Sequence, residues 1–302
     1  MRVFVTGATG FIGSAVVQEL INAGHQAIGL ARSDAAAEAL AGAGARVQRG
    51  DLEDLDSLRR GAAASDGVIH TAFVHDFTRY ADAGEIDRRA VETIGAALAG
   101  SNRPFVVTSG TAVFTSGSVA TEEDAPDTSS VGAIRIASER ATLELASKGV
   151  RAVVLRLPPS VHGDGDHGFV PLLINIAREK GASAYIGDGE NRWGAVHRLD
   201  AARLFRLAIE KAEAGSVLHG VAEEGVKFRA IAEVIGKRLR LPVVGKSREE
   251  AAEHFGWFTG FASIDNPTSS KLTRERFDWR PAHAGLIADI DRANYFEKQL
   301  NH

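Results

Sequence analysis

The stretch Thr6-Gly7-Ala8-Thr9-Gly10-Phe11-Ile12-Gly13 decides the fold. It follows an apolar, strand-like run and opens an amphipathic, helix-like stretch. Gly7 permits the tight turn, Gly10 lets a diphosphate approach the backbone, and Gly13 lets helix and strand pack closely. The start of the helix then offers free N–H groups and a partial positive charge. The spacing therefore predicts a site for the diphosphate of a nucleotide, although a purely structural turn would carry similar glycines.

Short apolar runs alternate with amphipathic stretches through the first half of the chain. Runs rich in Val, Ile and Leu, each followed by a helix, predict a doubly wound parallel sheet, the Rossmann-type α/β fold. The predicted strands are Arg2–Thr6, Gln26–Leu30, Arg46–Gln48, Gly67–His70, Phe105–Thr108 and Arg151–Arg156. The predicted helices are Phe11–Ala23, Asp34–Ala43, Asp54–Gly61, Ile86–Ala99 and Gly132–Lys148.

The pattern changes after Leu157-Pro158-Pro159, where glycines and turn residues gather. We therefore expect a dinucleotide-binding domain over residues 1–158 and a smaller, mostly helical substrate-side lobe over residues 159–302. Residues 195–221 are expected to return to the first domain, with a strand at Val217–Val221. Helices are predicted in this part at Ala201–Ala212, Phe228–Arg240 and Ser247–Phe255.

Composition excludes several classes of protein. The 302 residues carry a formal net charge of −4, so no basic field indicates nucleic acid. No apolar run approaches the roughly 18 residues of a transmembrane helix. The absence of cysteine excludes disulfides, thiolate metal sites and a cysteine nucleophile. Because the chain opens directly on a strand-like run, we expect a cytoplasmic protein without a signal peptide.

Segments spread over nearly the whole chain resemble the extended and atypical short-chain dehydrogenase/reductase superfamily, which contains sugar-nucleotide epimerases and dehydratases. The N-terminal glycine stretch is the strongest of these matches. It is joined by Gly50-Asp51-Leu52, His70-Thr71-Ala72-Phe73, Val107-Thr108-Ser109-Gly110-Thr111-Ala112-Val113-Phe114, Arg156-Leu157-Pro158-Pro159-Ser160-Val161-His162-Gly163, Val196-His197-Arg198-Leu199-Asp200-Ala201-Ala202 and Trp279-Arg280-Pro281.

The resemblance implies a nicotinamide dinucleotide cofactor. Asp51 and Leu52 would contact its adenine, Thr71, Ala72 and Phe73 would run beneath it, and the segment with Pro158 would lie beside the nicotinamide. The glycine stretch, with Gly7, Thr9, Gly10, Phe11, Ile12 and Gly13, would hold its diphosphate.

Residues after the second predicted strand favour NADP(H) over NAD(H). An arginine near this point accommodates a ribose 2′-phosphate, where an acidic residue would bind the ribose hydroxyls. Arg32 supplies a permanent cation with a fork of donors, and Ser33 supplies a hydroxyl. The alternative is that Arg32 is a solvated loop residue and Asp34 caps the next helix.

The superfamily's usual catalytic pair, a tyrosine and a lysine in the pattern Y-x-x-x-K, is missing. The only tyrosines are Tyr80, Tyr185 and Tyr295, and none lies on the expected helix. The matching positions carry Arg135 and Glu139. Arg135 would stabilise a developing oxyanion, or the two residues would form a plain surface salt bridge one helical turn apart.

Two hypotheses about function remain open. In the first, the protein is an NADPH-dependent reductase of a small carbonyl compound, with Ser109, Thr111, Arg135 and His162 as the candidate catalytic residues. An arginine does not readily release a proton, so Ser109, Thr111, His162 or water would supply it. In the second, the protein is a non-catalytic NADP(H)-binding sensor or regulator. A sugar-nucleotide epimerase or dehydratase is less favoured, because those reactions depend most on the missing pair.

The remaining constellations give weaker hypotheses. By resemblance Arg192 and Trp193 line the substrate pocket, where Trp193 would stack and Arg192 would contact an anion; a core tryptophan beside a surface arginine is the alternative. The run His162–His167 has metal-ligand residue types, but no further ligand cluster accompanies it and we expect no metal. Phenylalanines between residues 255 and 261 indicate a core stripe, an oligomer contact or an apolar wall for substrate. A homodimer is possible because dimers are common in the superfamily.

Overall fold

Parallel strands form the main sheet in the computed structural model, which describes residues 1–75, 80–115 and 117–297. The sheet has seven strands in the order β10-β6-β5-β4-β1-β2-β3, and every neighbouring pair is parallel. The Rossmann-type doubly wound sheet predicted from the sequence is therefore confirmed. Its strands are β1 (Arg2–Thr6), β2 (Gln26–Ala31), β3 (Arg46–Arg49), β4 (Gly67–His70), β5 (Pro104–Gly110), β6 (Arg151–Leu157) and β10 (Ser216–His219).

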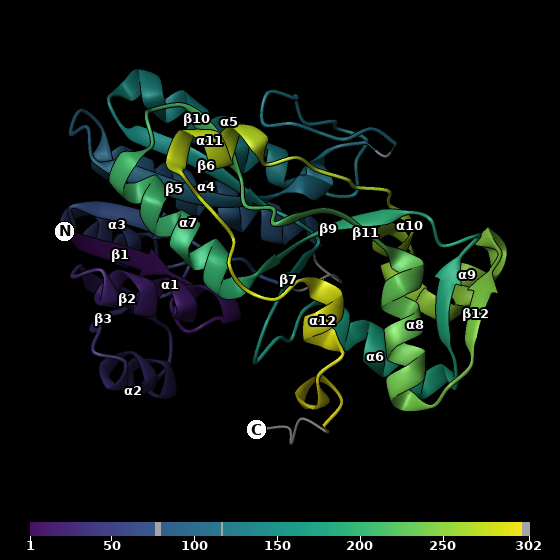
Figure 1. Ribbon diagram of the computed structural model, residues 1–302. Coiled ribbons are helices and arrows are strands. Elements are labelled where there is room, and N and C mark those ends of the chain that lie inside the picture. The colour runs from purple at the N-terminus through teal and green to yellow at the C-terminus, as the bar shows by residue number, and fades with distance from the viewer. Residues whose placement is uncertain (76–79, 116, 298–302) are drawn as a thin grey trace.

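Helices cover both faces of this sheet, so its inner strands are buried on both sides and read as continuous apolar runs, whereas the edge strand β3 is mostly exposed (Figure 1). On one face lie α1 (Phe11–Asn22), α2 (Asp34–Gly42) and α7 (Arg198–Lys211). On the other lie α3 (Leu55–Ala63), α4 (Tyr80–Leu98) and α5 (Ile136–Glu144). The helix predicted over Gly132–Lys148 is divided, because short 3-10 turns flank α5 at Ala133–Arg135 and Leu145–Lys148.

A second lobe follows β6 and has its own apolar core. It contains two small sheets, ordered β11-β9-β7 and β12-β8, so it holds more strand than the mostly helical lobe we expected. The strands are β7 (Ser160–His162), β8 (Ser183–Ile186), β9 (Arg192–His197), β11 (Glu223–Lys227) and β12 (Val243–Lys246). The helices after β6, apart from α7, are α6 (Phe169–Lys180), α8 (Phe228–Leu239), α9 (Arg248–Phe255), α10 (Thr259–Ser263), α11 (Lys271–Phe277), which packs on β10 and α7 of the main domain, and α12 (Leu286–Ile290).

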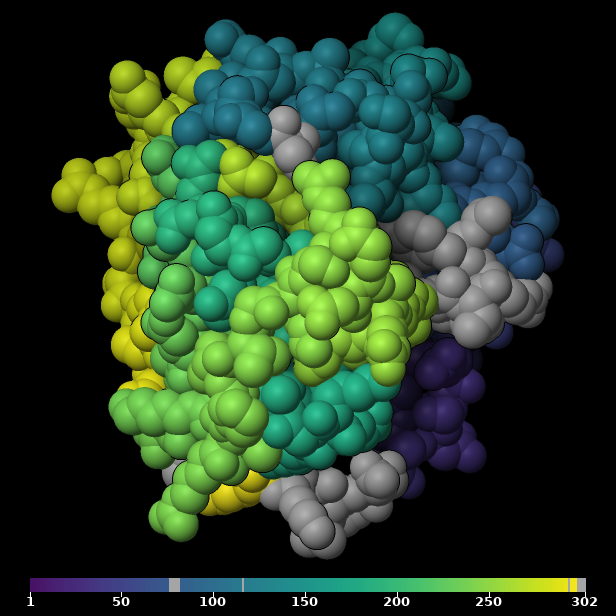
Figure 2. All heavy atoms as spheres, turned by 90° about the vertical axis from the view of Figure 1, so that its right-hand side faces the viewer, coloured from purple at the N-terminus to yellow at the C-terminus, as the bar shows by residue number. Residues whose placement is uncertain are grey.

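The second lobe lies beside the main sheet (Figure 1). Figure 2 shows the outer side of this lobe in green, with the chain that follows β5 above the lobe and the N-terminal residues, in purple, to its side. The sheet order reverses between β1 and β4, since the chain leaves β1 toward β2 and β3 and returns to β4 on the other side. Ligands of open α/β sheets bind at the carboxyl ends of the strands at such a point. Within the described ranges no helix is long and apolar enough to cross a membrane.

Candidate functional site

Two of the three glycines at the corner between β1 and α1 leave no room for a side chain. Gly7 has a φ of +66°, and a Cβ there would lie 2.7 Å from the backbone nitrogen of Ala72. A Cβ on Gly13 would lie only 2.0 Å from the carbonyl oxygen of Gly7 and 2.9 Å from Oγ1 of Thr71. The corner is therefore wedged against the segment that follows β4, at the point where the sheet order reverses.

The opening turn of α1 has free donors. Gly10 is the N-cap of the helix, and no side chain caps it. A Cβ on Gly10 would meet only the Gly7 oxygen, at 3.2 Å, so the space beyond Gly10 is open. The first N–H groups of a helix have no partner within it and attract an anion. The corner therefore fits a dinucleotide diphosphate, with Phe11 and Ile12 supplying backbone donors and Thr9 exposed beside them.

Arg135 lies against the segment that follows β4 and is held by a buried acid. Its Nη1 is 3.6 Å from Oδ1 of Asp87, its Nη2 donates to the carbonyl oxygen of Thr108, and its guanidinium carbon lies 4.2 Å from the centre of the Phe73 ring. Asp87, on α4, is 1% exposed and also accepts from Ser138 at 2.5 Å. Arg135 is thus fixed against Phe73, which the sequence placed beneath the cofactor.

The acid belongs to a buried polar chain that reaches the end of β1. Nε2 of His70 lies 3.1 Å from Asp87, and its Nδ1 lies 2.8 Å from Oγ1 of Thr6. Burial alone would raise the pKa of Asp87, but the charge of Arg135 and hydrogen bonds from His70 and Ser138 hold that pKa below its ordinary value. The carboxylate is therefore ionised and supports a cationic guanidinium at neutral pH.

Glu139 does not pair with Arg135, so the surface salt bridge considered from the sequence is wrong. Its carboxylate accepts two hydrogen bonds from Arg156 on β6, at 3.0 and 2.8 Å. Both side chains are 2% exposed. The two charged positions that replace the usual tyrosine and lysine are therefore each neutralised by a separate buried partner.

The two candidate hydroxyls near the end of β5 differ. Oγ of Ser109 is buried and has no hydrogen-bond partner among the residues that the structure describes, so it is free to bind another group. Thr111 is wholly buried, and its hydroxyl donates to Asn266 at 2.6 Å. Of the two hydroxyls, that of Ser109 is therefore the one not already engaged, while Thr111 binds the second lobe to the end of β5.

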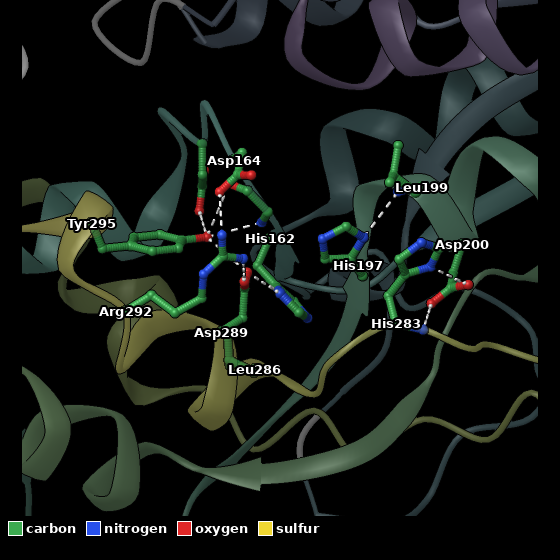
Figure 3. A network of polar contacts seen from close by, with 12 residues as sticks. His162, Asp164, His197, Leu199, Asp200, His283, Leu286, Asp289, Arg292 and Tyr295 are labelled. Atoms are coloured by element: carbon green, nitrogen blue, oxygen red, sulfur yellow. Dashed lines mark hydrogen bonds and ion pairs between the residues drawn. The ribbon is translucent and has the colours of Figure 1, made fainter.

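His162, the last residue of β7, lies close to Asp289 and His197 (Figure 3). It is 1% exposed, and its Nδ1 lies 2.8 Å from Oδ2 of Asp289. The ring packs edge-on against His197, which in turn stacks on His283 at 4.6 Å. Burial and the neighbouring imidazoles lower the pKa of His197 to about 4, so its ring is neutral at physiological pH. The contacts of His162 bind the C-terminal segment to the lobe, and none of them involves Ser109 or Arg135.

Trp193 cannot offer a stacking face to a substrate, so that prediction is wrong. The side chain is 0% exposed and lies among the rings of Phe169, Phe228 and Phe258. The core alternative is therefore the correct one for Trp193. Arg192 binds Asp265 through two hydrogen bonds, of 2.9 and 2.7 Å, which occupy the guanidinium expected to contact an anion.

Near the carboxyl end of β2, Arg32 is exposed and has no ion-pair partner among the residues that the structure describes. Ser33, not Asp34, caps α2, because its Oγ accepts from the backbone of Ala36 at 3.2 Å. Arg49, at the end of β3, pairs with Asp34 at 2.5 Å. Two guanidinium groups and a hydroxyl thus follow the ends of β2 and β3.

The other residues implied by the resemblance lie around the same edge of the sheet. Asp51 accepts hydrogen bonds from the backbone of Glu53 and Asp54, which shapes the turn before α3. Leu52 is half-buried beside it, and Pro158 is buried directly after β6.

Comparison with known proteins identifies the family. The model of the NAD dependent epimerase/dehydratase family matches residues 3–219. The chain belongs to this family. The "Uncharacterized protein C2A9.02" of Schizosaccharomyces pombe is 54% identical over 98% of this chain and 100% of that protein. The 4-hydroxy-2-methyl-3-oxo-4-farnesyl-3,4-dihydroquinoline-1-oxide ketoreductase of Stigmatella aurantiaca is 28% identical over 85% of this chain and 80% of that protein.

A solved member of the epimerase/dehydratase group has the same fold. The dTDP-glucose 4,6-dehydratase DesIV of Streptomyces venezuelae, with NAD and TYD bound, superposes with a TM-score of 0.81 at 19% identity, over 99% of this chain and 98% of that one. The similarity supports the Rossmann-type architecture and leaves the chemistry to be argued from the residues.

The loop after β7 is bound by the C-terminal segment. The hydroxyl of Tyr295 accepts from the backbone of Gly163 at 2.9 Å and donates to Asp166 at 3.2 Å. Arg292 bridges Asp164 and Asp289 (Figure 3). These contacts hold the loop formed by residues 163–168 in place. We call the contacts of Arg292 and Tyr295 with this loop and with Asp289 the C-terminal clasp.

The clasp gives a prediction for pH dependence. Burial raises the pKa of Asp166 from 3.8 to about 6, although the backbone of Gly168, Tyr295 and the nearby His167 and His162 oppose the rise. The folded protein therefore prefers the protonated carboxyl, and the stability that this provides below pH 4 is lost as the pH rises through about 6. Asp166→Asn, which mimics the protonated form, should raise the free energy of unfolding at pH 8 by up to about 3 kcal/mol and change little at pH 4.

Melting temperatures of both proteins between pH 4 and pH 8 test this prediction. Asp164→Asn, on the exposed side of the same loop, is the matched control and should show no such divergence with pH. Parallel curves for Asp166→Asn and the unmodified protein would mean that the carboxyl is hydrated rather than buried.

Several residues of the site escaped prediction from the sequence. Asp87 carried a usable signal, because it falls on the apolar stripe of α4 with Ala83, Ala90 and Val91, where an acid must find a partner. Asn266 and Asp289 carried none, since each meets its partner from a distant part of the chain.

Proposed function

We propose that the protein is an NADP(H)-dependent oxidoreductase that reduces a small carbonyl compound, or oxidises the corresponding alcohol. The observation that carries this proposal is the uncapped glycine corner, which is open where a dinucleotide diphosphate would bind. The buried, unpartnered hydroxyl of Ser109 and the fixed guanidinium of Arg135 lie at the ends of neighbouring elements on the same edge of the sheet. The ketoreductase of Stigmatella aurantiaca supports the same reaction class.

When bound, the nicotinamide supplies or accepts the hydride. The Ser109 hydroxyl would donate a hydrogen bond to the carbonyl oxygen of the substrate, because no competing partner for it lies among the described residues. Arg135 would stabilise the negative charge that develops on this oxygen, and Asp87 with the Thr108 carbonyl keeps its guanidinium in place without reorganisation. The guanidinium keeps its proton, so water would deliver the proton to the alkoxide.

The structure favours a simple reductase over a sugar-nucleotide epimerase. Epimerisation by the tyrosine and lysine pair requires a phenol that gives and takes a proton, and the described part of the expected helix has Arg135 and Glu139 instead. A non-catalytic NADP(H) sensor is the second candidate, because Glu139 and Thr111 are both engaged in structural contacts.

Turnover separates these functions. Purified protein should oxidise NADPH in the presence of at least some members of a panel of aldehydes and ketones, with kcat reduced in Ser109→Ala. Tight NADPH binding without turnover of any substrate would favour the sensor, and absence of binding to either nicotinamide dinucleotide would reject both functions.

Arg32 provides the test of cofactor preference. Arg32→Asp should weaken NADPH binding about 10- to 100-fold, because a charge-assisted contact to the 2′-phosphate is replaced by repulsion, while NADH binding should change little. The matched control is Arg46→Asp, which makes the same charge change at the opposite end of β3, where Arg46 is also exposed. Isothermal titration with both cofactors measures the ratio, and an unchanged preference would remove Arg32 from the 2′-phosphate site.

A further inference from the structure

An arginine of α7 lies against Phe11, next to the glycine corner. Arg198 is the first residue of α7, and its guanidinium carbon lies 5.0 Å from the ring centre of Phe11, the first residue of α1. His167, from the loop after β7, packs edge-on against the same ring at 5.7 Å. The starts of two helices and the clasped loop therefore meet at Phe11.

Arg198 has no compensating acid in the described part of the chain. Among residues 1–75, 80–115 and 117–297 no carboxylate forms an ion pair with it. By contrast, Arg206 on the same helix binds Glu19 and Glu210. A cation on the first residue of a helix opposes the helix dipole, so the charge of Arg198 would be better stabilised with an anion beside it.

The loop after β7 packs against the Arg198 side chain. A Cβ on Gly163 would lie 3.2 Å from Cγ of Arg198, and one on Gly165 would lie 3.7 Å from its Nη1. Both glycines have a positive φ, +138° and +82°. Tyr295 fastens the loop through the backbone of Gly163. Arg198 is therefore half-buried, although no charged partner for it lies in the part of the chain that the structure describes.

We propose that Arg198 binds the diphosphate of the dinucleotide from the side opposite the glycine corner. The backbone donors of Phe11 and Ile12 approach the anion from one wall, and the planar guanidinium supplies charge-assisted hydrogen bonds from the other. The Arg198 side chain belongs to α7 and packs against the loop of residues 163–168. An anion bound by both Arg198 and the start of α1 would therefore connect this loop to the main sheet. This assignment rests on the proposed dinucleotide site and adds to it a residue outside the glycine stretch.

Binding measurements test the assignment without reference to turnover. Arg198→Met keeps an unbranched side chain over Phe11 and removes the charge, so it should weaken NADPH binding about 10- to 100-fold. Arg198→Lys, which keeps the charge but lacks the fork, should give an intermediate affinity. Adenosine 2′-monophosphate has no diphosphate, and its affinity should be the same in all three proteins.

Arg203→Met is the matched control, because Arg203 is an exposed arginine on the same helix, and it should bind NADPH as the unmodified protein does. Unchanged NADPH affinity in Arg198→Met would overturn the assignment alone. Equal losses for NADPH and adenosine 2′-monophosphate would also overturn it, since they would reveal a structural role. Failure of the unmodified protein to bind NADPH and NADH would reject the dinucleotide site itself, together with the assignment.

Discussion

Replacing Glu139 with lysine is expected to lower the free energy of unfolding by at least about 3–5 kcal/mol, the cost of leaving a buried charge without its partner. The Glu139 carboxylate accepts two hydrogen bonds from Arg156, and both side chains are 2% exposed. Lysine would place a second cation beside the Arg156 guanidinium. The penalty therefore includes repulsion in addition to the lost pair.

The prediction is specific to the buried position. Glu144→Lys makes the same charge change at the exposed end of the same helix, and it should alter the free energy of unfolding by less than about 0.5 kcal/mol. Urea unfolding followed by circular dichroism measures both variants. A Glu139→Lys protein as stable as Glu144→Lys would mean that the Arg156 pair is hydrated or dispensable.

The same variant restores the lysine of the family pattern. We expect no gain of turnover from Glu139→Lys, alone or with Arg135→Tyr, because the surroundings of both positions have changed with them. Asp87 and the Thr108 carbonyl are arranged for a guanidinium at position 135, and Arg156 is arranged for a carboxylate at position 139. The two ion pairs, Arg135 with Asp87 and Glu139 with Arg156, thus replace the tyrosine and lysine pair together with its surroundings, so restoring two side chains does not restore the family's usual site.

The fold could be predicted where its signals lie close together in the sequence. β1 and β4 have the predicted bounds, and α1 begins at the predicted Phe11, because alternating apolar runs and the glycine stretch are local patterns. Helix α6 was missed, since it follows directly on a cluster of glycines that indicated turns. The small sheets of the lobe were missed for a related reason: their strands are short and pair across long gaps in the sequence.

The candidate site was predicted less completely, because its chemistry depends on contacts between distant residues. The sequence placed Arg135 and Ser109 correctly near the ends of the helix and strand that carry them, but gave no means to pair Arg135 with Asp87. Trp193 was assigned to the substrate pocket by resemblance, whereas phenylalanines from three other elements enclose it. The sequence left a catalytic role open for His162, because its partner Asp289 lies 127 residues later in the chain and no local pattern indicates the contact.

Gly10→Ala and Gly13→Ala are expected to separate binding from folding at the glycine corner. On Gly10 a methyl group would meet only the Gly7 oxygen, at 3.2 Å, and the backbone has an ordinary φ of −73°, so we expect a loss of stability of no more than about 1 kcal/mol. That methyl would occupy the space through which a diphosphate reaches the backbone. NADPH binding should fall more than about 100-fold, the equivalent of two lost charge-assisted hydrogen bonds.

On Gly13 the methyl group would lie 2.0 Å from the Gly7 oxygen, so α1 would have to move away from β1, and both stability and NADPH binding should be lost. Gly42→Ala is the control: no atom would lie within 4 Å of its Cβ, and alanine is preferred inside a helix, so stability should be unchanged or slightly raised. Thermal melting and isothermal titration of the three variants give the comparison. If Gly10→Ala binds NADPH as tightly as the unmodified protein, the diphosphate does not approach this corner, since a methyl group there would stand between the anion and the free N–H groups of α1.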